Sequence, residues 1–305
     1  MPLEPVANLM ADARHRGYAV GYFENWNLES LQGVLDAAEA VDAPVIVGFN
    51  GEFLSRTERR TSERLALYGA LGKAAAESSP IPCALVFNEC PKDSWVLAAA
   101  ELGFNLVMLV DQSVPYENYL ARVKGIVEFS HRRAVAVEAE LDELPSGASG
   151  RVEGETKLTD PGLAERFVHD TRVDLLAVSV GNVHVRTDSE QALNLDHLAT
   201  LCERIPVPLV LHGGSGISAE SIREAVRLGV AKVNYGTYLK QRCLTAMRAA
   251  VAVSENNPHM MLGLGGPSDV MVAARLAVRD AVLERIEALG CCGKARGWST
   301  GKGRS

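Results

Sequence analysis

The stretch Leu209-Val210-Leu211-His212-Gly213-Gly214-Ser215-Gly216 leads an apolar strand directly into a histidine and a glycine-rich turn. Glycine lets main-chain N–H groups approach an anion closely, and Ser215 adds a hydroxyl, so the turn predicts an anion cradle. Ser218 suits the N-cap of a helix that begins near Ala219, whose positive end would face the same place. A possible metal ligand, His212, therefore stands beside a phosphate-binding turn. A tight turn carrying a surface histidine is the alternative interpretation.

The same unit, a strand followed by a helix, repeats along the chain. Nearly continuous apolar runs are typical of parallel strands that are covered on both faces. They occupy residues 19–23, 44–49, 83–87, 106–110, 135–139, 175–180, 208–211 and 230–233. Amphipathic helical segments lie between them, at residues 28–41, 94–102, 116–132, 160–171, 196–204 and 219–228. Eight such alternations predict an α/β fold of the (β/α)₈ barrel type. A doubly wound sheet is the main rival.

Two segments interrupt the alternation. Residues 142–158 are polar and contain glycine, and they follow the fifth strand. A loop at that place is either an active-site lid or a disordered surface loop. Residues 290–305 are rich in Gly, Lys, Arg and Ser, which predicts a flexible basic C-terminal tail. We therefore expect one barrel domain over residues 1–289.

Composition excludes several classes of function. The net charge of −7 argues against a nucleic-acid surface. No run of about 18 apolar residues is present, and the start Met1-Pro2-Leu3-Glu4-Pro5 lacks the features of a signal peptide. The 6 cysteines form neither a CxxC pair nor a disulfide framework. We expect a cytoplasmic protein with no membrane span and no nucleic-acid partner.

Polar side chains gather where the predicted strands end, which is where barrel enzymes keep their reactive groups. Glu24, Asn50, Asn88, Glu89, Asp111, Glu138, Glu140, His184, His212, Asn234 and Thr237 all hold such positions.

His184 and His212 end neighbouring strands, and Glu89 could add a carboxylate from across the rim. Two histidines and one carboxylate make an open metal site that zinc accepts, although manganese or iron would also fit. The metal would act as a Lewis acid that stabilises an enediolate. His184 could instead be a core histidine, and Glu89 could pair with an arginine or lysine.

Over residues 5–285 the chain resembles the class II, metal-dependent fructose-bisphosphate and tagatose-bisphosphate aldolases. The best-matched parts are Pro208-Leu209-Val210-Leu211-His212-Gly213-Gly214-Ser215-Gly216-Ile217 and Gly229-Val230-Ala231-Lys232-Val233-Asn234. Weaker matches include Ala177–His184 and Val137–Leu141. The resemblance implies a barrel enzyme that forms homodimers or homotetramers. It also implies cleavage of a ketose phosphate between C3 and C4 through a metal-stabilised dihydroxyacetone-phosphate enediolate.

The resemblance assigns roles to residues of this chain. His184 and His212 match metal ligands, and Asn234 matches a substrate contact. The phosphate-binding positions are Gly213, Ser215 and Thr237, with Gly214 in the same turn. Asp111 and Glu140 match acids that can hold a second metal.

The departures from the family pattern cluster at the rim. Asn88-Glu89-Cys90 replaces Asp-His-Gly, so the family's proton-transferring aspartate is the amide Asn88, which has no useful basicity. Glu89 would then replace a histidine as metal ligand and weaken the Lewis acid.

Further departures concern the substrate contacts. Asn234-Tyr235-Gly236-Thr237-Tyr238 loses both acids of Asn-x-Asp-Thr-Asp, and Val185 replaces a glycine. The lid glutamate has no match in register, and Glu153 and Glu155 are the nearest acids. Glu24 and Asn50 stand where the family has smaller or neutral substrate contacts.

We therefore expect a divergent metal-dependent aldehyde-lyase, most simply a Zn²⁺ enzyme, that cleaves or forms a C–C bond in a phosphorylated keto compound. Glu89, Asn88 and Glu153 are the candidate catalytic residues, because a missing acid or base costs about 10²–10⁴-fold in rate unless another group replaces it. An isomerase or epimerase using the same metal enediolate, and a non-catalytic sugar-phosphate-binding protein, are the alternatives.

Overall fold

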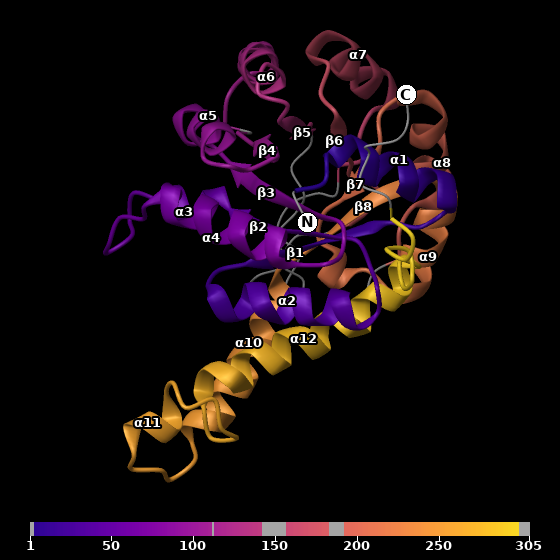
Figure 1. The fold of residues 1–305 in the computed structure, drawn as a ribbon. Coiled ribbons are helices and arrows are strands. Elements are labelled where there is room, and N and C mark those ends of the chain that lie inside the picture. The colour runs from indigo at the N-terminus through magenta and orange to yellow at the C-terminus, as the bar shows by residue number, and fades with distance from the viewer. Residues whose placement is uncertain (1–2, 112, 142–156, 183–191, 299–305) are drawn as a thin grey trace.

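The computed structural model describes residues 3–111, 113–141, 157–182 and 192–298. Eight parallel strands close into a barrel in the order β1 to β8, with β1 pairing β8 (Figure 1). The strands are β1 Val20–Asn25, β2 Val45–Asn50, β3 Cys83–Cys90, β4 Leu106–Leu109, β5 Ala136–Glu140, β6 Leu175–Ala177, β7 Leu209–Leu211 and β8 Val230–Tyr235. The predicted (β/α)₈ barrel is confirmed, and each apolar run in the sequence contains or overlaps one of these strands.

Several strands continue past their apolar run into polar residues, and this places the candidate site. β1 extends to Asn25, β3 to Cys90 and β8 to Tyr235. Glu24 and Asn234 are therefore fixed by strand pairing at the carboxyl end of the barrel, and Glu89 lies between the paired residues Asn88 and Cys90. The pairing of β3 with β4 shifts register between Phe87 and Cys90. That irregularity surrounds Glu89, whose φ of 50° lies in the left-handed region.

Helices cover the outside of the barrel (Figure 1). They are α1 Val6–Arg16, α2 Leu28–Ala40, α3 Gly51–Ser55, α4 Leu65–Ser78, α5 Asp93–Glu101, α6 Tyr116–His131, α7 Pro161–Thr171, α8 Leu195–Arg204, α9 Ala219–Leu228, α10 Thr237–Val251, α11 Pro258–Met261 and α12 Val270–Leu289, with a 3₁₀ turn at Gly214–Gly216. The predicted cap is confirmed, because the Ser218 hydroxyl accepts the main-chain N–H of Ser221. The sequence analysis did not identify α1, α3, α4, α10, α11 or α12.

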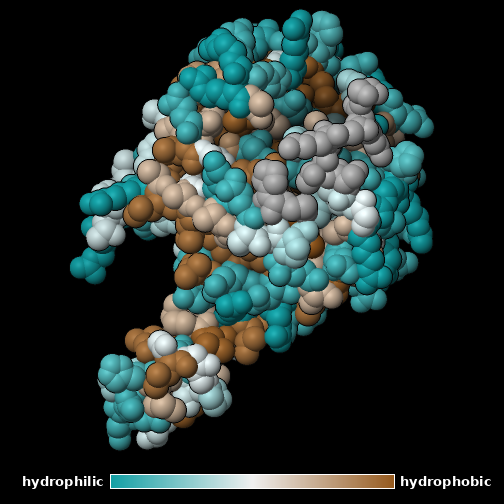
Figure 2. Space-filling model, viewed as in Figure 1, coloured by the Kyte–Doolittle hydropathy of each residue, from teal (hydrophilic) through white to brown (hydrophobic). Residues whose placement is uncertain are grey.

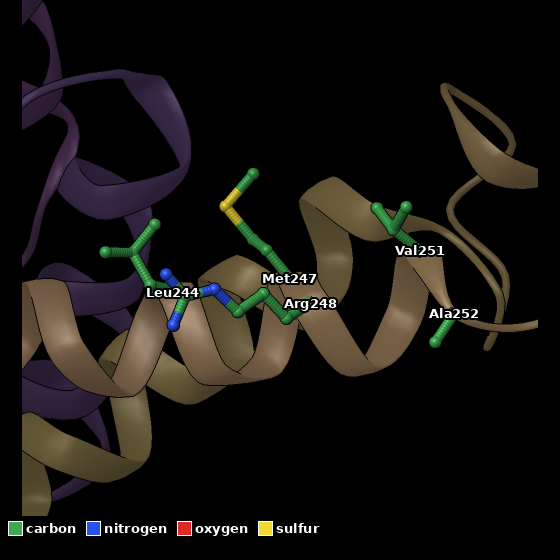
Figure 3. Close-up of a pocket in the computed structure, with 5 residues that line it drawn as sticks. All are labelled: Leu244, Met247, Arg248, Val251 and Ala252. Carbon is green, nitrogen blue, oxygen red and sulfur yellow. The ribbon is translucent and has the colours of Figure 1, made fainter.

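The far ends of α10 and α12, together with α11, form an arm that projects away from the barrel in Figure 1. Apolar residues lie along this arm in Figure 2. Leu244, Val251, Val253, Leu262 and Leu264 are exposed there. The close-up in Figure 3 shows Leu244, Met247 and Val251 on the outside of α10, where they line a shallow apolar groove with Arg248 and Ala252. Exposed apolar patches of this kind mark interaction surfaces.

The start of the predicted tail is packed rather than free. Cys291 is fully buried, and the main-chain N–H groups of Gly293 and Ala295 donate to the carbonyls of Val41 and Asp42. Arg16 donates to the Lys294 carbonyl at 2.7 Å. The expectation of a flexible segment from residue 290 is therefore wrong as far as residue 298, because these contacts dock it beside α1 and α2. Residues 299–305 lie outside the described part. No helix within the described ranges is long and apolar enough to cross a membrane.

Candidate active site

One cavity of about 230 Å³ opens at the carboxyl end of the barrel. It collects most of the rim residues that the sequence predicted to bind substrate or metal. The predicted residues that line it are Glu24, Asn50, Asn88, Glu89, Gly213, Ser215, Asn234 and Thr237. Gly214 does not line it, because a Cβ there would lie 2.8 Å from Val233 Cγ1 and 2.9 Å from the Asn234 carbonyl oxygen. Gly214 is thus a glycine because the turn packs tightly on β8.

His212, at the end of β7, is fully buried among three carboxylates. Its Nε2 lies 2.9 Å from Glu138 Oε1, its Nδ1 lies 3.0 Å from Glu89 Oε1, and the same Nδ1 lies 3.8 Å from Glu140 Oε2. Burial alone would lower the pKa of His212, but Glu140, Glu138 and Glu89 outweigh it and raise that pKa to about 10. In the absence of a metal the imidazole is therefore charged at neutral pH.

Glu138 is held in its ionised form although it is completely buried. Burial raises the pKa of this carboxyl, but Lys232 and His212 reverse the effect and bring the pKa below its usual value. Lys232 Nζ lies 2.8 Å from Glu138 Oε2. Because an ionised carboxylate only accepts hydrogen bonds, His212 Nε2–H donates to it and Nδ1 is turned toward Glu89.

Glu89 points into the barrel rim. Its Oε2 accepts a hydrogen bond of 2.7 Å from Asn50 Nδ2, while its Oε1 faces His212. The positive φ at residue 89, within the β3 irregularity, is the backbone feature that accompanies this direction. Positive φ is uncommon for residues other than glycine, and strained residues of this kind cluster at functional sites.

The arrangement around His212 fits a metal ligand. Ligating histidines commonly donate their other ring N–H to a carboxylate, as Nε2 does here to Glu138. Two ligands on one ion at about 2.0–2.2 Å each lie roughly 3 Å apart, which matches the separation of His212 Nδ1 and Glu89 Oε1. Within the described ranges, no group of three or more His, Cys, Asp or Glu residues forms a metal site on its own. A complete donor set would need a further ligand, and the predicted His184 lies outside the described residues.

An anion cradle adjoins His212. Gly213 has a φ of 67° and begins the 3₁₀ turn that carries Ser215. The Ser215 hydroxyl accepts the main-chain N–H of Tyr238 at 3.2 Å, which ties the turn to the first turn of α10. The N-cap residue of that helix, Gly236, has no side chain to accept a hydrogen bond, so the first-turn N–H groups that Ser215 does not use, together with the positive end of the helix, face the cavity.

Glu24 enters the cavity from β1 and forms an ion pair with Lys240 of α10. Burial raises the pKa of Glu24, and Lys240 opposes that rise without cancelling it. The Lys240 ammonium lies 4.3 Å from the centre of the Phe53 ring. Gly236 leaves room for the carboxylate, because a Cβ there would lie 2.3 Å from Glu24 Oε2.

Two other predicted site residues remain, Asp111 and Glu153. Asp111 is not among the residues that line the cavity. Asp111 is bound by Arg122, which also pairs with Asp93. That ion pair would have to break before Asp111 could join Glu140 in a second metal site, so the structure does not favour that prediction. Glu153 lies outside the described residues.

The sequence analysis did not identify Lys232 or Tyr22 as residues of the site. The Lys232 ammonium nitrogen lies 5.2 Å from the centre of the Tyr22 ring. The signal was available: Lys232 and Asn234, like Glu138 and Glu140, are two residues apart and so share one face of a strand.

The comparisons with known proteins agree with this architecture. The family model described as fructose-bisphosphate aldolase class-II matches residues 4–294. The crystal structure of the YdjI aldolase from Escherichia coli K12 is 30% identical, with a TM-score of 0.80 over 96% of this chain and 100% of that one. A putative fructose-1,6-bisphosphate aldolase from Coccidioides immitis is 23% identical, with a TM-score of 0.79 over 96% of this chain and 98% of that one. The fructose-bisphosphate aldolase from Campylobacter jejuni is 19% identical, with a TM-score of 0.74 over 95% of each chain.

The last two likenesses support the fold. The family match extends over nearly the whole chain, so this protein belongs to the class II fructose-bisphosphate aldolase family.

Proposed function

We propose that this protein is a metal-dependent aldehyde-lyase that cleaves or forms a C–C bond in a phosphorylated keto compound. The observation that best supports this proposal is the orientation of His212. Its Nε2 is hydrogen-bonded to Glu138, and its Nδ1 faces Glu89 beside an anion cradle. His212 and Glu89, with His184 as the proposed third ligand, would hold the divalent metal, most simply Zn²⁺. When bound, the metal supplies a Lewis acid for the negative charge that develops on substrate oxygens.

The chain's own residues bind and orient the substrate. Its phosphate is received by the main chain at Gly213, the hydroxyls of Ser215 and Thr237, and the N-terminal end of α10. These donors carry no formal charge, so the dipole of α10 supplies the positive potential. Asn50 on β2 and Asn234 on β8 line the same cavity, and Nδ2 of Asn234 is an amide donor for a substrate oxygen.

A residue other than Asn88 must transfer the proton, because the Asn88 amide neither gives nor accepts a proton at neutral pH. Glu24 is the described carboxylate best placed for that task. It lines the cavity, and burial raises its pKa toward the range in which a carboxyl group exchanges protons readily. Glu153 remains a second proposed proton carrier.

Product analysis tests this function. Purified protein is supplied with Zn²⁺, Mn²⁺ or Fe²⁺ and incubated with ketose 1-phosphates and ketose bisphosphates, and the products are separated by mass spectrometry. Two smaller products, lost on chelation and in His212→Ala, support the lyase. One product of equal mass indicates an isomerase or epimerase. Ligand-dependent thermal stabilisation without turnover indicates a binding protein, and neither of those results is compatible with the lyase.

The chain also carries a surface suited to a second copy of itself, and a homo-oligomer is part of the proposal. The apolar groove on α10 shares Leu244 with the cavity, so a copy that covered the groove would also border the site. Light scattering on wild type should give a mass of at least twice 32.7 kDa. Val251→Asp combined with Leu262→Asp should reduce it to the monomer, and a monomeric wild type would contradict this part. The 6 unpaired cysteines suit the reducing cytoplasm that we propose for it.

A further inference from the structure

Lys232 is a fully buried lysine in the interior of the barrel, and nothing in the proposed chemistry uses its charge directly. Its ammonium group contacts two residues of the site at once. Nζ lies 2.8 Å from Glu138 Oε2 and donates to Asn234 Oδ1 at 2.6 Å. Burying an ammonium group costs free energy of folding unless the group is paired and hydrogen-bonded, so the two contacts of Lys232 are what make its burial possible.

The first contact fixes His212. Glu138 uses Oε2 for Lys232 and Oε1 for His212 Nε2, at 2.9 Å. A carboxylate with a cation at one oxygen stays ionised and accepts at the other, so Nε2 keeps its proton. Nδ1 is then the ring nitrogen that can lose its proton and bind a metal.

The second contact fixes Asn234. An ammonium group can only donate, so the oxygen of this amide faces Lys232 and its nitrogen faces the other way. Asn234 is 6% exposed, lines the cavity, and its Nδ2 has no hydrogen-bond partner among the described residues. A buried N–H₂ without a partner costs free energy, which a substrate oxygen would recover.

We propose that Lys232 is a positioning residue that sets the hydrogen-bond polarity of the whole site. Through Glu138 it keeps His212 Nδ1 available for the metal, and through Oδ1 it presents Asn234 Nδ2 as a fixed donor to the substrate. The substrate group at that place is a hydrogen-bond acceptor, namely a carbonyl oxygen or the oxyanion that forms from it. This inference rests on the proposed function where it refers to a metal and a substrate. The contacts of Lys232 with Glu138 and Asn234 are independent of that function.

The first experiment needs neither metal nor substrate. ¹⁵N NMR of the metal-free protein at pH 7 reports the Nε2–H group of His212, and side-chain amide spectra report Asn234, with Asn234→Asp used for assignment. In wild type the Nε2–H proton resonance lies downfield, because this group donates to Glu138. Lys232→Met is expected to shift the Nε2–H resonance of His212 and the amide resonances of Asn234. Wild-type spectra in Lys232→Met would overturn the proposal.

The second experiment is a double-mutant cycle on Co²⁺ affinity. Losing an outer-shell partner of a ligand typically weakens metal binding 10–100-fold, and we expect this for Lys232→Met and for Glu138→Gln. The double variant should be no weaker than Glu138→Gln, because Lys232 acts on His212 through Glu138. Additive losses would overturn the relay. Val107→Ala, which is buried on β4 and does not line the cavity, is the matched control for general destabilisation.

Lys232→Met leaves Glu138 buried without its cation and could fail to fold. Lys232→Met/Glu138→Gln removes both charges and avoids that problem. Comparison of this double variant with Glu138→Gln alone then decides the question: equal Co²⁺ affinities support the relay, and a further loss refutes it. Failure of wild type to bind Co²⁺ would count against the proposed function. The NMR experiment would still test the positioning role of Lys232, because it requires no metal.

Discussion

The metal-free protein should lose stability as the pH rises from about 6.5 toward 10, because His212 gives up a proton that the fold holds. Folding raises the pKa of His212 from 6.5 to about 10, since three carboxylates outweigh the effect of burial. A raised pKa means that this stabilisation is complete below pH 6.5 and is lost as the pH rises through the folded value. About 3.5 pH units at 1.36 kcal/mol each give roughly 5 kcal/mol, an upper figure for a fully buried group.

Urea unfolding in the presence of a chelator, at pH 6.5, 8 and 9.5, measures this loss. Burial also lowers the pKa of Lys232 and raises the pKa of the buried cysteines, so wild type is compared at each pH with His212→Asn, which retains these groups. The difference between the two proteins in free energy of unfolding should shrink by about 1 kcal/mol or more for each pH unit above 7. Glu89→Gln should show an intermediate slope. A difference that is constant with pH would refute the reasoning, because His212 would then be neutral in the metal-free fold.

Three further predictions follow from the same contacts. Binding of Co²⁺ at pH 7.5 should release about one proton, because the metal displaces it from His212, and calorimetry in buffers of different ionisation enthalpy will show no release if the ring is already neutral. Gly236→Ala should push the Glu24 carboxylate away from Lys240, since the new Cβ would lie 2.3 Å from Glu24 Oε2. It should change the free energy of unfolding by only about 1 kcal/mol, yet lower kcat/KM on a cleavable ketose phosphate at least about tenfold, and unchanged kinetics would remove Glu24 from the site. Arg122→Met should destabilise the fold by about 1 kcal/mol in urea, because it removes the ion-pair partner of the half-buried Asp111 and of the exposed Asp93, and a neutral effect would show that these ion pairs contribute no stability.

The barrel was predictable from the sequence because strands covered on both faces are nearly continuous apolar runs, and eight of them alternate with helices. The rim residues Glu24, Glu89 and Asn234 followed from the same pattern, since the carboxyl ends of parallel strands meet on one face. The strand boundaries were less accurate: β3 continues through Asn88 to Cys90, because pairing with β2 and β4 holds polar residues that propensity alone would assign to a loop.

The pairing of charges inside the barrel was not predictable in the same way. Lys232 lies within an apolar strand, and only its partner on β5, far away in sequence, explains why it is there. The direction of Glu89 depends on a positive φ that its residue type does not signal. Docking of residues 291–298 depends on hydrogen bonds to Val41 and Asp42, whereas the composition of that segment is typical of a free tail.

The central claim is that His212, oriented by Glu138, binds a divalent metal through Nδ1 together with Glu89. Anomalous scattering from crystals exposed to Zn²⁺ and dihydroxyacetone phosphate tests it most directly. The account predicts one strong peak about 2.0–2.2 Å from His212 Nδ1, with a Glu89 oxygen in its coordination sphere and no peak in His212→Ala crystals. A peak at another place, or a His212 ring that keeps Nδ1 on Glu89 alone at full zinc exposure, would contradict it.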